Sequence, residues 1–500
     1  MIGNTMTNRQ RAFWTIPALV AGFCLRAWFV LMHPRIGGDG SVYGDIARNW
    51  LQTGIYGLTG PTGVRPTLMR LPGYPLFLAI CFKIFDAHGY AAALWAQCFV
   101  DLATCLLVSG IAREIAWEDS KAALIALWIA ALCPFTANFA AAALTETLSL
   151  FCVALAFYSL IRWRRRLRHA GPVTGDDRQR SSSSNAMNLW IWVIAFAMAY
   201  AILLRPDGGL LPAAVVPAMI WVVWRHGLGP IRGFGAVALC SVITLLPLIP
   251  WTARNARTFH QFQPLAPKYT AEPGEVSGDG FHRWYRTWAI DYASTVSIYW
   301  KYDMESMDIG ELPRHAFDSG EQYQKTDKLF SDYNELGETT QAIDDRFAEL
   351  ASERVAANRV GYYLLLPSAR VANMWLRPRT ELLDIPAQWW RYNEHPVATL
   401  FAAFYAALNL AYLAAALLGF VRALQQRNSL PVLWAAAGFI ALRCLLLATV
   451  DNSEPRYVLE CFPLVIALGA VFLAGNQPKS LLSINSAESS SSPRTTPFGS

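Results

Sequence analysis

The sequence predicts an all-α polytopic membrane protein. The chain has 500 residues, of which 54% are hydrophobic and only 16% are charged, whereas a soluble protein carries about 25% charged residues. Several apolar runs approach the roughly 20 residues that a helix needs to cross a bilayer. A transmembrane β-barrel would instead require alternating segments of about ten residues, and the sequence contains none.

Ten apolar segments are predicted to cross the membrane. In chain order they are 13–32, 91–111, 121–138, 143–161, 188–204, 209–224, 234–252, 398–420, 430–449 and 457–474. The first is too long for the core of a signal peptide and is not followed by the usual cleavage pattern. We therefore expect it to remain in the protein as a transmembrane helix.

The short apolar segment 72–86 determines the predicted topology. The segment 162–168 contains five arginines, and such basic segments normally stay in the cytoplasm. It shares the cytoplasm with the basic N-terminus only if 72–86 lies flat on the membrane. We therefore predict that both termini are inside and that the first loop, 33–90, is external.

Four regions follow from this topology. Residues 1–252 form an N-terminal membrane module, 253–397 a large external loop, 398–477 the C-terminal helices and 478–500 a disordered tail. Within the large loop, 362–376 has the composition of a second interfacial helix. The linker 169–187 is polar and rich in serine, which predicts flexibility.

The nine cysteines predict neither disulfides nor a zinc site. All lie in or beside apolar segments and none lies in the large loop, where an oxidising compartment would favour disulfides. Their spacings match no zinc pattern. We predict no cofactor, while the sequence leaves a divalent metal open. The external histidines, including His282, are scattered and are predicted to be structural.

Acidic residues occur where spans are predicted to meet the external surface. The run 37–50 carries Asp39 and Asp45, and its apolar residues recur at helical spacing, which predicts an amphipathic helix on the membrane. A carboxylate there loses hydration, so it is a functional candidate, although a solvated loop acid is the commoner case. Glu146 begins a span and is a second candidate; the alternative is an acid that interacts with the helix dipole.

Arginines occur on the same predicted surface. Arg205, Arg254 and Arg456 each lie at the external end of a span, although arginine favours the cytoplasmic side. Singly each is an ordinary anchor, but together they predict an anionic ligand, and phosphate suits the guanidinium fork. Arg70 adds a fourth cation, with an interfacial anchor as its alternative. A Gly-rich phosphate loop is absent, so we predict no nucleotide site.

The order of these motifs resembles the bacterial members of the dolichyl-phosphate-mannose-protein mannosyltransferase (PMT-like) family, which are glycosyltransferases of the GT-C fold. The resemblance covers about 13–474. It rests on six short motifs, which are Asp-x-x-x-Tyr-x-x-x-Ala at 39–47, Pro-Gly-Tyr-Pro-Leu-Phe-Leu at 72–78, Thr-Glu at 145–146, Arg-Pro at 205–206, Pro-Trp-Thr-x-Arg-Asn at 250–255 and Glu-Pro-Arg-Tyr at 454–457.

The resemblance implies a GT-C-like bundle of about ten transmembrane helices whose active site faces the periplasm from the inner membrane. The donor would be a polyprenyl-phosphate monosaccharide, and Asp39 would be the base. The family commonly has Glu after this Asp, and here it is Gly40, so a second carboxylate role is absent or taken by Asp45. The predicted catalytic residues are Asp39, Asp45 and Glu146, and the predicted substrate-binding residues are Tyr43, Arg70, Arg205, Arg254, Arg456 and Tyr457.

The predicted reaction moves a hexose or pentose to a hydroxyl of a lipid, glycan or protein, with inversion and with no nucleic acid involved. Lipid phosphate transfer needs a base, cations for the departing phosphate and an apolar groove. The alternatives are a lipid-linked phosphoryl or oligosaccharide transferase, a transporter or flippase of lipid-linked saccharides, and a non-catalytic assembly partner. A transporter places charges near the bilayer midplane, and the deeper Asp101 and Arg443 favour that alternative.

Overall fold

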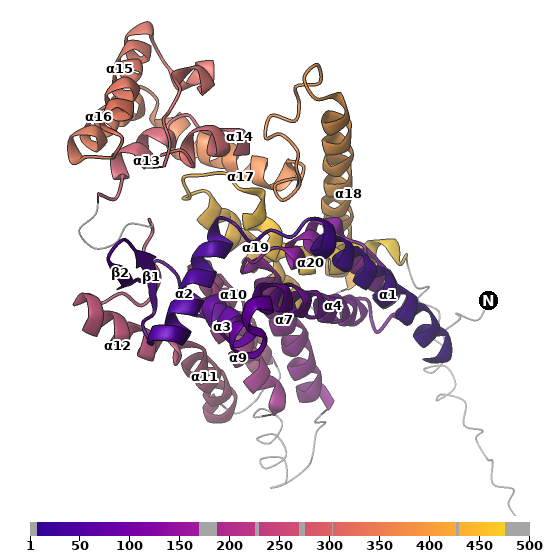
Figure 1. Ribbon diagram of the computed structural model, residues 1–500. Helices are drawn as coiled ribbons and strands as arrows, with labels where there is room; N and C mark the ends of the chain where they lie inside the picture. The colour runs from indigo at the N-terminus through magenta and orange to yellow at the C-terminus, as the bar shows by residue number, and fades with distance from the viewer. Residues whose placement is uncertain are drawn as a thin grey trace, which may run out of the picture.

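The computed structural model describes residues 8–169, 188–225, 230–269, 276–302, 304–426 and 430–475. These residues are almost entirely helical (Figure 1). Their two strands, β1 (Gly57–Gly60) and β2 (Gly63–Pro66), form one antiparallel hairpin. The predicted linker beyond its first residue and the predicted tail 478–500 lie outside the described residues.

Eight helical segments in the described part of the chain are long and apolar enough to cross a membrane. They are α1 (Asn8–Met32), α4 (Gly89–Ile115), α7 (Glu146–His169), α10 (Leu210–Arg225), α11 (Pro230–Leu245) continued by α12 (Leu248–Phe259), α18 (Pro396–Gln426), α19 (Leu430–Leu447), and η8 (Pro455–Cys461) continued by α20 (Phe462–Leu473). The predicted all-α polytopic fold is therefore confirmed. A further apolar helix, α9 (Leu189–Leu204), has 16 residues.

The predicted span 121–138 is broken. The helix α5 (Ser120–Ala131) is followed by α6 (Pro134–Ala137) and the short η2 (Asn138–Ala141), and the two parts are bent by 48°. Pro134 has no N–H to donate and disfavours helical geometry at Cys133, which is extended. Counted as one broken span, this pair is the ninth. The bend leads the chain directly to the start of α7.

Two short helices follow α1 and pack on each other. They are α2 (Asp39–Thr53) and α3 (Gly73–Phe85), and α3 is followed by the single turn η1 (Asp86–His88). Tyr43 of α2 contacts Tyr74 of α3 with ring centroids 5.1 Å apart. With 13 residues, α3 is about 20 Å long, whereas a bilayer core is about 30 Å thick. The predicted helices at both positions are confirmed, and the hairpin between them was not predicted.

The large segment between α12 and α18 has a hydrophobic core of its own, which includes Phe281, Trp284 and Phe347. In Figure 1, α15 and α16 stand apart from the membrane helices, whereas α17 lies close to α19. Its elements are α13 (Asp279–Tyr285), α14 (Tyr292–Ser294), η4 (Thr295–Tyr299), η5 (Ile309–Glu311), η6 (Arg314–Ala316), α15 (Gly320–Leu336), α16 (Gln341–Ala357), η7 (Gly361–Leu365) and α17 (Leu366–Leu376). The helix predicted at 362–376 is present as η7 continued by α17.

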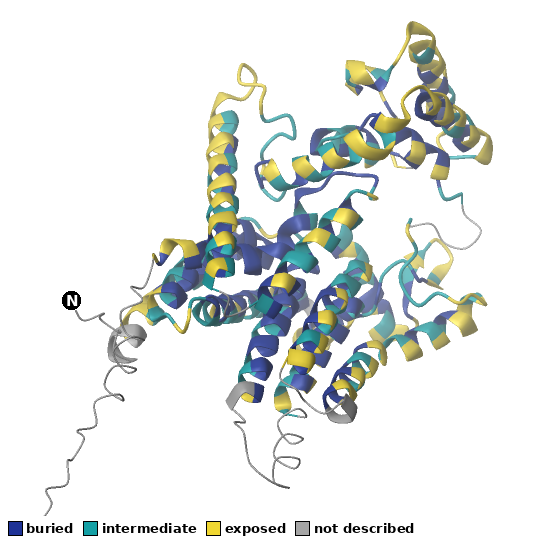
Figure 2. Cartoon of the chain, turned by 180° about the vertical axis from the view of Figure 1, so that it is seen from behind, coloured by how far each residue is buried: buried dark blue, intermediate teal, exposed yellow. Residues whose placement is uncertain are grey.

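The membrane helices differ in how far they are covered. Figure 2 shows exposed residues along much of α18, and Phe404 and Leu417 are among its large apolar side chains that face outward. Lipid can cover such a surface. The deep acid Asp101 is instead fully enclosed, and Arg26 Nε donates to its Oδ2 at 2.8 Å. This buried pair links α1 to α4. Asp101, the first of the two deep charges, is therefore neutralised by an arginine of a neighbouring helix.

Candidate functional site

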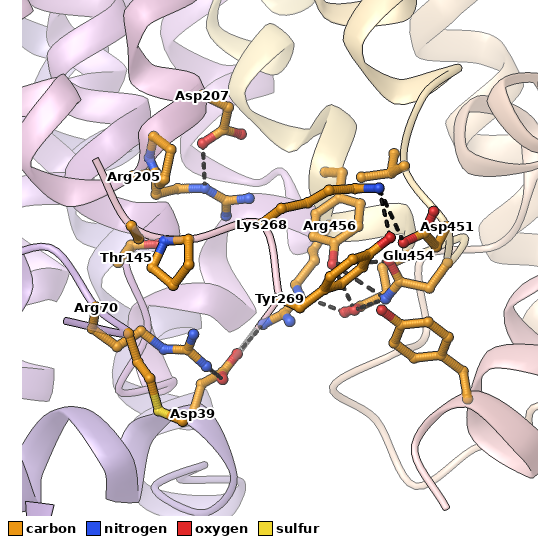
Figure 3. Close-up of a pocket in the computed structure, with 18 of the residues that line it drawn as sticks. Asp39, Arg70, Thr145, Arg205, Asp207, Lys268, Tyr269, Asp451, Glu454 and Arg456 are labelled. Atoms are coloured by element: carbon orange, nitrogen blue, oxygen red, sulfur yellow. Dashed lines mark hydrogen bonds and ion pairs between the residues drawn. The ribbon is translucent and has the colours of Figure 1, made fainter. Parts of the chain in front are cut away.

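A cavity of about 980 Å³ lies at one end of the membrane helices, and Figure 3 shows the side chains that project into it. We call its two sides the inner wall and the outer wall. The inner wall consists of the lining residues within 39–207 and 454–457, which belong to the membrane module and the start of η8. The outer wall consists of the lining residues within 266–304 and 446–452.

Asp39 lies on the inner wall between two arginines (Figure 3). It begins α2 directly after Gly38, whose positive φ of 60° favours glycine. Arg70 Nη2 donates to Oδ1 at 2.7 Å and Arg456 Nη1 donates to Oδ2 at 3.1 Å. Burial opposes ionisation, but Arg456 and Arg70 outweigh it and hold the pKa of Asp39 below its usual 3.8. Asp39 is therefore a carboxylate at neutral pH.

Glu146 lies beside this group, at the first position of α7, and is 1% exposed. Arg205 Nη1 donates to its Oε1 at 3.0 Å, and Arg456 Nη1 is 3.9 Å from the same oxygen. Arg456 therefore lies between Asp39 and Glu146. The structure thus brings together four residues that are far apart in the sequence, Asp39, Glu146, Arg205 and Arg456.

The buried arginine Arg443 supports the inner wall through ion pairs. It is fully buried, and it donates from Nη1 to Asp207 Oδ2 at 2.6 Å and lies 2.7 Å from Glu460. Asp207 also accepts from Arg205 Nε at 3.0 Å. The second deep charge thus belongs to an ion-pair network that reaches the cavity. Asp207 and Glu460 were missed in the sequence, although Asp207 follows the Arg-Pro motif directly.

Glu454 was also missed as a site residue. Its carboxylate lies 2.5 Å from Arg456 Nε and accepts from Tyr457 Oη at 2.8 Å and from Asn452 Nδ2 at 2.7 Å. An acid two residues before the arginine of the same turn was the signal that could have identified it. Tyr457 lines the cavity, and its role in substrate binding stays a prediction.

Of the remaining predicted residues, Tyr43 lines the cavity and two others do not. Burial raises the pKa of Tyr43 to about 12, so its hydroxyl stays protonated. Asp45 accepts from the Thr59 N–H at 2.7 Å and from Thr59 Oγ1 at 2.8 Å. Arg254 donates to the carbonyls of Tyr56 and Thr67, both at 2.7 Å. Asp45 and Arg254 thus hold the hairpin region in place.

The charges that line the cavity nearly cancel. Among the described residues, the lining contains four cations, Arg70, Arg205, Lys268 and Arg456, and five carboxylates, Asp39, Glu146, Asp207, Asp451 and Glu454. A phosphate can therefore reach an arginine here only by competing with a carboxylate for it. Within the same described ranges, no group of three or more His, Cys, Asp or Glu side chains could hold a metal ion.

The outer wall has one carboxylate, Asp451, which is 4% exposed. It lies 3.2 Å from Arg286 Nε, 3.9 Å from Lys268 Nζ and 4.0 Å from His282 Nδ1. Burial lowers the pKa of His282 to about 4, with Lys268 adding to the effect, so the imidazole is neutral at pH 7. His282 was predicted to be structural, and the structure places it in the cavity lining.

No family model and no curated protein sequence matches the chain. Among solved structures, it is similar to the archaeal oligosaccharyltransferase AglB from Archaeoglobus fulgidus in complex with an inhibitory peptide and a dolichol-phosphate, with 14% identity and a TM-score of 0.44. That match covers 97% of this chain and 53% of the other, so the chain spans about half the length of that protein. ArnT from Cupriavidus metallidurans bound to undecaprenyl phosphate is similar over 93% of this chain and 77% of that one, with 15% identity and a TM-score of 0.35. The PMT-like resemblance stays a prediction.

Proposed function

We propose that this chain is a membrane glycosyltransferase that moves a monosaccharide from a polyprenyl phosphate to an acceptor hydroxyl, with inversion. The observation that carries the proposal is Asp39, an ionised carboxylate held by Arg70 and Arg456 in a cavity at one end of the membrane helices. The proposal includes a GT-C-like arrangement in the inner membrane and a cavity that opens to the periplasm. The transferred group is a hexose or a pentose.

The arginines and the carboxylate serve one reaction in this proposal. The donor phosphate competes for Arg456 and Arg70, which are 19% and 23% exposed, and its binding releases Asp39 from them. Loss of its cationic partners raises the basicity of a carboxylate. Asp39 thus becomes a stronger base when the donor is bound.

The charges balance during the chemical step. Asp39 accepts the proton of the acceptor hydroxyl while the acceptor oxygen bonds to the anomeric carbon. The bond from that carbon to the phosphate oxygen breaks, and its electron pair stays on the phosphate, which gains one negative charge. The arginines stabilise this developing charge, and protonated Asp39 no longer competes for them. Direct displacement of this kind inverts the anomeric carbon.

The experiment is a transfer assay with the purified full chain. Polyprenyl-phosphate sugars that carry a radiolabel are incubated with the protein and a membrane extract, and the label is followed into lipid, glycan and protein fractions. We expect the label to leave the polyprenyl phosphate and to appear in one fraction. Label that stays on intact polyprenyl phosphate while crossing vesicle membranes would instead identify a flippase and refute the proposal.

Two arginine variants test the donor site. Arg205→Ala and Arg456→Ala should each reduce donor use about ten- to hundredfold, because a charged hydrogen bond contributes about 1.5–3 kcal/mol. Arg391→Ala is the matched control, since Arg391 is half exposed in a loop, pairs with Glu394 and does not line the cavity. Wild-type donor kinetics in both test variants would show that these arginines are structural.

A further inference from the structure

The outer wall of the cavity is rich in aromatic side chains that the proposed phosphate chemistry does not use. Tyr269 lies flat on His282, with ring centroids 4.1 Å apart and planes within 4°. Tyr299 and Tyr302 line the same wall. Trp300 lines it too and remains 42% exposed, although its ring packs edge-to-face with the ring of Tyr292, with centroids 5.6 Å apart. Lys268 Nζ also lies over the Tyr269 ring, 4.5 Å from its centroid. The exposed part of Trp300 is therefore the aromatic surface that this wall offers to a ligand.

Polar groups also line the outer wall. Asn452 Nδ2 donates to Glu454 and Ser277 Oγ donates to Asp279, and each side chain keeps an oxygen that can accept a hydrogen bond. His282 Nδ1 is buried and has no hydrogen-bond partner among the described residues. The charged groups of this wall are largely engaged with each other, since Lys268 donates to Tyr269 Oη at 2.6 Å and lies beside Asp451. The outer wall thus offers stacking surfaces and neutral hydrogen-bonding groups.

We propose that the outer wall is a binding subsite for a neutral sugar ring, with Trp300 as the stacking residue. A sugar ring has apolar C–H faces, which pack on aromatic rings, and hydroxyls at its edge, which donate and accept hydrogen bonds. Such a combination of apolar walls and a few placed polar groups is typical of small-molecule sites. The inference rests on the proposed function, and the ring belongs either to the donor or to a carbohydrate acceptor.

Saturation-transfer difference NMR on the purified full chain tests the subsite directly. The probes are the methyl glycosides of glucose, mannose, galactose and arabinose. The protein is kept in an amine-oxide detergent, because glycoside detergents would themselves occupy the site. We expect saturation transfer to the ring protons of at least one glycoside. The signal should fall about three- to tenfold in Trp300→Ala, which is the effect of losing one aromatic contact.

Two controls separate this subsite from general binding and from the donor site. Trp390→Ala removes a tryptophan of similar exposure, 47%, that does not line the cavity, and it should leave the signal unchanged. Arg70→Ala should also leave it unchanged, since Arg70 pairs with Asp39 on the inner wall and that wall is not needed for a free glycoside. Failure of the proposed transfer reaction with a Trp300-dependent signal intact would overturn the function and not the subsite.

The source of the ring is decided by competition. If a saturating polyprenyl-phosphate sugar displaces the glycoside, and plain polyprenyl phosphate does not, the subsite holds the donor sugar. If the glycoside signal persists with the donor bound, the subsite holds a carbohydrate acceptor. The proposal is overturned if no glycoside gives a signal, if the signal is equal in wild type and Trp300→Ala, or if only a set of short peptides gives a Trp300-dependent signal.

Discussion

A carboxylate held by two guanidinium groups is a poor base until those groups are drawn away. Asp39 shows this at the scale of a single residue, because Arg70 and Arg456 bind one oxygen each. Its lowered pKa implies that the acidic limb of its titration in the free protein lies below pH 3.8. Loss of activity between pH 4 and 6 would therefore belong to another group, or to Asp39 after the donor has taken its arginines.

The variant Asp39→Asn tests this residue. It keeps the shape of the side chain and removes the proton acceptor, so transfer at saturating donor should fall at least about a hundredfold, within the usual range of general base catalysis. Donor binding, measured separately, should survive because Arg70 and Arg456 remain. Normal transfer by Asp39→Asn together with an inactive Glu146→Gln would assign the base to Glu146.

At the scale of elements, the hairpin β1–β2 explains why Asp45, which was predicted as a catalytic residue, does not line the cavity. Asp45 lies six residues after Asp39, which places it about 120° away around the axis of α2. Its two oxygens accept from Thr59, which lies in β1. Mutation of an acid that links a helix to a strand lowers stability, whereas mutation of an acid that moves a proton lowers activity. The two roles can therefore be separated by experiment.

We expect Asp45→Asn to lower thermal stability while preserving the activity of the folded fraction. The variant loses charge-assisted hydrogen bonds, each worth about 1.5–3 kcal/mol, and Thr59→Val should have a smaller effect because it keeps the N–H donor. The protein remaining in solution after heating is measured by size-exclusion chromatography, and transfer is then normalised to it. Unchanged stability with lost transfer would restore the predicted catalytic role of Asp45.

The extent to which the sequence predicts these elements follows from the range of the interactions involved. Hydropathy is local, so most membrane helices and α2 could be placed. The break within 121–138 was not predicted, although Pro134 is a local signal for it. The partners of Asp39 were not visible, because Arg70 and Arg456 are 31 and 417 residues away. Glu460 escaped notice because it lies inside an apolar run and reaches Arg443 only in the folded bundle.

For the whole molecule, α7 connects the cavity to the opposite side of the bundle. Glu146 begins this helix in the cavity lining, and the five arginines of 162–168 lie near its other end. From Glu146 the helix rises about 24 Å to Arg162 and about 33 Å to Arg168, distances that bracket the roughly 30 Å of a bilayer core. If the arginines are cytoplasmic, as basic segments usually are, the cavity must face the exterior.

Cysteine labelling in intact cells tests this orientation of the whole chain. Glu338→Cys, in the exposed turn after α15, should react with a membrane-impermeant maleimide added outside. Ser182→Cys, in the predicted cytoplasmic linker, should react only after permeabilisation. The wild-type chain is the background control, because seven of its nine cysteines are buried, Cys444 is partly so and Cys24 lies within the span of α1. Labelling of Ser182→Cys but not Glu338→Cys in intact cells would place the cavity in the cytoplasm, and a donor that carries its sugar on the external leaflet could not then reach Asp39.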